Sequence, residues 1–246
     1  MTQYQWSLVL GTVAGVADLL GALILTQKAH WDRTVLKYCV AVGASFMLAA
    51  AFVRMLPEST ERLPHAFFFV LVGYFGIHLF EHIVAPHFHF GEEEHPEALL
   101  NPSVGYLALL GLGVHTFFDG VTIASGFLVG PSLGFLLFFA VVLHKLPEGF
   151  TIASVMLASG RSRAAAAGAA GLLGGSTILG VFLTSLFAQF GGYALALSAG
   201  VTIYVAASDL IPEVNRERSP GLAWAVFGGL GLFALADWAV SSLGLH

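Results

Sequence analysis

Long apolar stretches separated by short polar segments make up nearly the whole chain. A membrane-spanning helix needs about 20 predominantly apolar residues, and Gly, Pro and polar residues divide this sequence into stretches of about that length. We therefore expect an all-α integral membrane protein with eight transmembrane helices, forming a single domain over residues 1–246. The predicted spans are about 5–27, 35–56, 64–85, 103–128, 132–158, 164–189, 192–212 and 221–243.

The composition supports a membrane protein over a soluble one. Hydrophobic residues make up 57% of the 246 residues and charged residues only 10%, and the mean hydropathy is +0.83. A soluble domain has about 25% charged residues. The single cysteine, Cys39, excludes a disulfide framework and a Cys-based zinc motif. There is no basic run typical of nucleic-acid binding, so we expect a lipid bilayer and no nucleic acid as partner.

Basic residues in the short connections predict the orientation, because such connections stay on the cytoplasmic side. They place both termini outside and the longest connection, about residues 86–102, in the cytoplasm. The basic residues that carry this prediction are Lys28, Arg33, Lys37, Arg161, Arg163, Arg216 and Arg218, against Arg62 on the other side. For the histidines in and beside the long connection, loose metal capture and simple solubility remain equal alternatives; these are His82, His87, His89 and His95, near Glu92, Glu93, Glu94 and Glu97.

Two segments at the middle of the chain, residues 115–125 and 144–154, are almost copies of each other. Both follow the pattern His-x-x-x-[Asp/Glu]-Gly-x-Thr-Ile-Ala-Ser. Helix positions four apart share one face, so His115 lies beside Asp119, and His144 beside Glu148. Each pair is expected near the middle of its span. The glycine after each carboxylate allows a neighbouring helix to come close.

A second internal similarity joins residues 54–58, at the end of span two, with residues 209–213, at the end of span seven. The two spans run in opposite directions, which suggests inverted repeats, a transporter architecture with its ion site near the midplane. Arg54 is expected to pair with Glu58, four residues on. The acidic residues near the span ends are interpreted as solvated caps: Glu58, Asp209 and Glu213.

The paired motifs predict a buried site for a divalent cation. An ionisable side chain at the bilayer centre costs about 2.5–3.5 kcal/mol, and a bound cation offsets that cost. Two imidazoles and two carboxylates suit Zn²⁺ and also admit Fe²⁺, Mn²⁺ or Cd²⁺. The motif of His115 and Asp119 by itself is equally explained as a hydrogen-bonded pair between helices. For His144, Lys145 and Glu148 the alternative is a buried ion pair between Lys145 and Glu148, which the duplication of the motif makes the weaker explanation. Asp18 and Asp237 also lie inside spans, where a pathway role and a packing role both remain open.

These motifs resemble those of the Zrt/Irt-like (ZIP) divalent-metal transporters. The resemblance rests on the span-four and span-five motifs and on the ends of spans two and seven, at residues His115, Asp119, Gly120, His144, Pro147, Glu148, Gly149, 56–58 and 211–213. It implies a ZIP-like bundle in which spans four and five carry the transport site and move against spans two and seven. It also implies transport toward the cytoplasm and possible homodimers.

The sequence departs from the family at a second, adjoining metal site. Where the family often has Asn in span four and a carboxylate in span five, this chain has Thr116 and Lys145. The predicted sixth span carries no acidic residue to complete that site. We therefore expect one bound ion, with Lys145 in the place of a second.

We predict a transporter in the cell membrane that moves Zn²⁺, or a similar divalent ion, by alternating access, without a resident cofactor or enzymatic activity. Protons compete for the same ligand atoms, so acid should weaken binding. One rival hypothesis is an intramembrane zinc hydrolase with Glu148 as general base, although no His-Glu-x-x-His motif is present. The other is a channel or a metal sensor.

Overall fold

The computed structural model describes residues 1–27, 33–83, 102–216 and 219–242. Within these residues, eight helical spans are long and apolar enough to cross a membrane, which confirms the all-α prediction. The long helices are α1 (Gln3–Gln27), α2 (Arg33–Ala50), α4 (Ala66–Ile83), α6 (Pro102–Val129), α7 (Pro131–Ala158), α8 (Arg163–Leu186), α9 (Gly191–Tyr204) and α11 (Pro220–Ser242). Shorter elements are η1 (Ala51–Met55), α3 (Leu56–Arg62), η2 (Ala188–Phe190), η3 (Val205–Leu210) and α10 (Ile211–Asn215).

Two spans extend further than the sequence predicted, because their prolines do not end them. The second span runs over Thr34–Arg62 and the seventh over Ala188–Asn215. Pro57 and Pro212 each lie in the first turn of a short helix that follows a π-helix, η1 or η3. Proline lacks the N–H that would bond the carbonyl four residues earlier, and a wider turn at that point lets the helix continue. The two similar motifs therefore share one backbone irregularity, as related repeats would.

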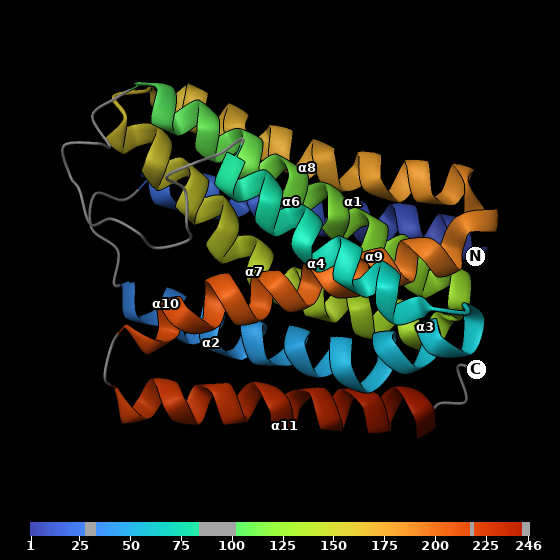
Figure 1. Cartoon of the computed structure of the whole chain (residues 1–246). Coiled ribbons are helices and arrows are strands. Elements are labelled where there is room, and N and C mark those ends of the chain that lie inside the picture. Colours follow the sequence, from blue (N-terminus) through green and yellow to red (C-terminus); the bar gives the residue numbers. More distant parts are fainter. Residues whose placement is uncertain (28–32, 84–101, 217–218, 243–246) are drawn as a thin grey trace.

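The long helices form two groups (Figure 1). In one group α1, α6, α7 and α8 contact one another; in the other, α4 packs on α9 and α2 packs on α11. The groups meet where α2 contacts α7 and where α6 contacts α9. The start of α1 and the end of α11 lie at the same end of the bundle, as an even number of crossings requires.

Glycines allow the closest helix contacts around the middle of the bundle. A Cβ atom on Gly149 would collide with the backbone of Asp18, and one on Gly120 with the backbone of Thr177. Gly149 thus brings α1 against α7, and Gly120 brings α8 against α6, as expected from the glycine in each motif. Helices in membranes commonly approach each other through such small residues.

The outer faces of α4 and α11 carry large exposed hydrophobic side chains, including Phe67, Phe75, Trp224 and Trp238. Such faces are unfavourable in water and favourable against lipid hydrocarbon. This chain is an integral membrane protein.

One expected side-chain contact is wrong. Arg54 does not pair with Glu58: its guanidinium donates to the carboxylate of Asp237 and to the hydroxyl of Ser241, both on α11, while Glu58 pairs with Arg62 at 3.6 Å. Asp237 therefore has a packing role. His82 lies within the third span, in the last turn of α4, where its Nδ1 donates to the carbonyl of His78. The remaining loop histidines, His87, His89 and His95, lie outside the described residues.

Candidate metal site

Four potential metal ligands from α6 and α7 meet between the two helix groups. His115, Asp119, His144 and Glu148 each offer one ligand atom, and these atoms all lie within 4.8 Å of one another. None of the four residues is more than 6% exposed. The two motifs recognised in the sequence therefore come together as one cluster.

The position of each histidine along its helix explains why the two motifs meet. α6 and α7 have 28 residues each, and only Gly130 separates them. His115 and His144 both lie near the middle of their helices, so two adjacent helices that cross in opposite directions bring them to the same depth. On each helix the carboxylate lies four residues after the histidine, about one turn further along the same face.

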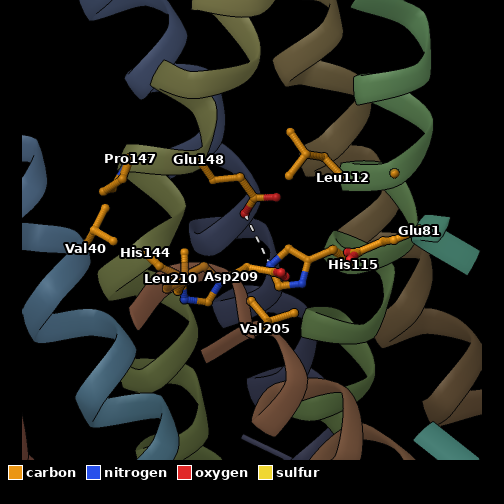
Figure 2. Close-up of a pocket in the computed structure, with 11 residues that line it drawn as sticks. Val40, Glu81, Leu112, His115, His144, Pro147, Glu148, Val205, Asp209 and Leu210 are labelled. Atoms are coloured by element: carbon orange, nitrogen blue, oxygen red, sulfur yellow. Dashed lines mark ion pairs between the residues drawn. The ribbon is translucent and has the colours of Figure 1, made fainter. Parts of the chain in front are cut away.

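The spacing of the ligand atoms is close to that of a tetrahedral site. His115 Nε2 and His144 Nε2 each lie 3.4 Å from the same oxygen, Asp119 Oδ2. His115 Nε2 lies 4.0 Å from Glu148 Oε2, and Figure 2 shows these two side chains pointing toward each other. Metal–ligand bonds of 2.0–2.2 Å correspond to about 3.3–3.6 Å between tetrahedral ligands. The two distances to Asp119 fall in this range, and the distance from His115 to Glu148 is longer.

A backbone contact sets the tautomer of one of the two histidines. His144 Nδ1 lies 3.0 Å from the carbonyl oxygen of Ala140, and because a carbonyl only accepts, Nδ1 carries the hydrogen. The lone pair of a neutral ring is then on Nε2, the atom that faces Asp119. Metal-binding histidines are commonly oriented in this way.

Lys145 lies inside the same cluster. Its Nζ donates a 2.8 Å hydrogen bond to Glu148 Oε2 and is 2.8 Å from Asp119 Oδ2. A third carboxylate, that of Asp18 on α1, is 3.5 Å away. The other predicted second-site residue, Thr116, is fully buried and donates its hydroxyl hydrogen bond to Gly113 of its own helix.

A small cavity opens beside the cluster, at the contact of the two helix groups (Figure 2). Two of its carboxylates were not recognised as site residues in the sequence: Glu81 on α4 and Asp209 on η3. The interpretation of Asp209 as a solvated cap is wrong, because the seventh span continues past it. A carboxylate within an apolar span is the signal that could have found Glu81. The lining residues are Val40, Glu81, Gly111, Leu112, His115, His144, Pro147, Glu148, Val205, Asp209 and Leu210.

The model of one protein family, described as ZIP zinc transporter, matches residues 91–237. The chain belongs to this family. The ZIP protein is also similar to the zinc transporter ZupT of Chlorobium luteolum. The two are 27% identical over an alignment of 264 positions, which covers 96% of this chain and 98% of the relative. The matched residues contain α6 and α7 with all four potential ligands. Membership in the family indicates a transporter of divalent metal rather than an enzyme.

Proposed function

We propose that this ZIP protein carries divalent cations, Zn²⁺ foremost, across a cell membrane by alternating access, and that His115, Asp119, His144 and Glu148 bind the ion in transit. The observation that carries the proposal is the buried group of four potential ligands, with ligand atoms within 4.8 Å of one another. Ionisable groups in the middle of a span are costly, and the single ammonium group of Lys145 does not balance the three carboxylates around it.

The donor set supports Zn²⁺. Two neutral imidazole nitrogens and two carboxylate oxygens supply four ligands and two negative charges, which match a four-coordinate divalent ion. Fe²⁺, Mn²⁺ and Cd²⁺ accept the same donors. A soft ion such as Cu⁺ would favour sulfur ligands, which this cluster does not contain.

The arrangement of the helices supports alternating access. The site lies on α6 and α7, which pack with α1 and α8, while the far wall of the cavity comes from α2, α4 and η3. A movement of one group against the other would open the site first to one side of the membrane and then to the other. Glu81 and Asp209 line this cavity beside His115, where their carboxylates can take part in transferring the ion.

The direction follows from two further parts of the proposal. The basic residues of the short connections favour both termini outside, and the family resemblance implies movement toward the cytoplasm. The 86–102 connection would then lie on the side of release.

Uptake into liposomes by the purified full-length protein tests the site assignment. His115→Ala removes one ligand of four, and Glu148→Gln replaces a carboxylate with a neutral, weaker amide oxygen. We expect each to abolish saturable Zn²⁺ uptake, with affinity lowered by more than about 100-fold, because even indirect supports of a metal ligand are worth about 10–100-fold. Glu58→Gln is the matched control, since Glu58 pairs with Arg62 away from the cluster. Wild-type uptake by a well-folded His115→Ala/Glu148→Gln protein would contradict the assignment.

A further inference from the structure

A third carboxylate reaches the metal-ligand cluster from a helix that carries none of the four ligands. Asp18, on α1, is 0% exposed, and the close contact of its backbone with Gly149 brings it to the cluster. Within the described residues, neither of its carboxylate oxygens accepts a hydrogen bond. Its ion-pair partner is Lys145, at 3.5 Å. A buried carboxylate without hydrogen bonds needs an explanation.

Lys145 connects Asp18 to the ligands. Its Nζ is 2.8 Å from Asp119 Oδ2 and 2.8 Å from Glu148 Oε2. These are the same oxygens that face the histidine nitrogens. A cation bound to them would lie close to the ammonium group, and the two like charges would repel each other.

The formal charges of the cluster favour a role for Asp18 in resolving this conflict. With the carboxylates ionised, the histidines neutral and Lys145 protonated, Asp18, Asp119, Glu148 and Lys145 sum to two negative charges, which one divalent cation cancels. Without Asp18 the sum is one negative charge, and a divalent cation would leave a net positive cluster. Uncompensated charge in a low-dielectric interior is strongly unfavourable.

We propose that Asp18 is a positioning residue of the transport site: when a divalent cation binds Asp119 and Glu148, Lys145 turns from them to Asp18 and forms a neutral pair beside the loaded site. The proposal rests on the proposed function of the four ligands. The required movement is small, because the ammonium group already lies within 4.0 Å of all three carboxylates.

The contacts of α1 argue against a purely structural role for Asp18. Lys145 Nζ lies 2.8 Å from Glu148 and from Asp119 but 3.5 Å from Asp18, so the contact between α1 and Lys145 is the longest of its three ion pairs. Gly149 and Gly21 already hold the two helices in backbone contact, since a Cβ atom on either would collide with the facing backbone.

Zn²⁺ binding to the purified full-length protein, measured by calorimetry, tests the proposal. In Asp18→Asn, the Lys145 ammonium group has only Asp119 and Glu148 as ion-pair partners, so it stays beside the ligand oxygens. The Zn²⁺ Kd of this variant should therefore rise at least about tenfold. Asp18→Glu keeps the charge and should remain within about threefold of wild type. Asp18→Asn/Lys145→Met restores two negative charges and should recover most of the loss.

Asp237→Asn is the matched control, because it breaks an intramembrane ion pair, with Arg54, outside the cluster. Its Kd should equal that of wild type even where its thermal stability is lower. A wild-type Kd for folded Asp18→Asn would overturn the proposal, as would a double variant that binds as weakly as Asp18→Asn.

Experimental structures of the wild-type protein, with chelator and with Zn²⁺, decide the matter without variants. In the Zn²⁺ structure Lys145 Nζ should lie nearer to Asp18 than to Asp119 or Glu148. Zn²⁺ on the four ligands with Lys145 still bonded to Glu148 would overturn the role of Asp18 and leave the proposed function intact. A wild-type protein that transports no divalent metal would instead contradict the proposed function and this inference together.

Discussion

Among single residues, Lys145 departs most clearly from the family pattern. The resemblance places it where a carboxylate often helps to bind a second ion. Its ammonium group, 2.8 Å from both Asp119 and Glu148, puts a positive charge beside the oxygens that a second ion would share. This contact supports the expectation of a single-ion site.

The number of bound ions can be counted by anomalous scattering at the zinc edge. Wild-type crystals should show one strong peak at the four ligands, and Lys145→Ala should keep that peak with altered affinity. Lys145→Asp removes the positive charge and adds a ligand, so a second peak within about 4 Å should appear. Two well-occupied peaks in the wild-type protein, one beside Lys145, would contradict this view.

Part of the site could be predicted at the residue scale and part could not. His115 with Asp119, and His144 with Glu148, follow from helical spacing alone. That both histidines share one oxygen of Asp119 depends on how α6 and α7 cross. The hydroxyl of Thr116 donates to a carbonyl of its own helix, a local contact that helical spacing alone permits.

At the scale of helices, residues at corresponding positions of the two π-helices have different roles. Arg54 and Asp209 occupy the same place in the two similar motifs, and both lie in a π-helix. Arg54 joins the second span to α11 through Asp237, whereas Asp209 lines the cavity beside the site. A similar backbone turn therefore serves packing in one repeat and the site in the other.

The glycine contact between α1 and α7 yields a prediction about stability. A methyl group at position 149 would meet the backbone of Asp18, so Gly149→Ala should lower the free energy of unfolding by about 1–3 kcal/mol. Gly168→Ala, on α8, is the matched control because its Cβ would meet nothing within 4 Å. Alanine there should raise stability by up to about 1 kcal/mol through helix propensity.

Thermal unfolding in detergent measures both glycine variants under the same conditions. A melting temperature for Gly149→Ala at or above that of Gly168→Ala would show that α1 and α7 do not approach each other as closely as the structure has them. Because Gly149 follows Glu148 directly, Gly149→Ala should also reduce Zn²⁺ uptake.

For the whole molecule, the site lies where two groups of helices meet. We predict from its polar sequence that the 86–102 connection changes the rate of uptake without being required for it, since polar loops between spans generally tolerate change. Replacing His87, His89 and His95 with Ser should therefore alter uptake modestly in liposomes. Complete loss of uptake, with normal folding, would make the connection part of the path.

The sequence by itself determined the membrane class, the eight spans and the two His–carboxylate pairs. These follow from local rules: the thickness of the hydrocarbon core sets the length of an apolar stretch, and the helical repeat places residues four apart on one face. Only the tertiary structure decided which distant residues meet, such as Asp18 with Lys145 and Arg54 with Asp237. The physical reason is that helix crossings depend on small residues and side-chain shapes, which hydrophobic periodicity does not encode.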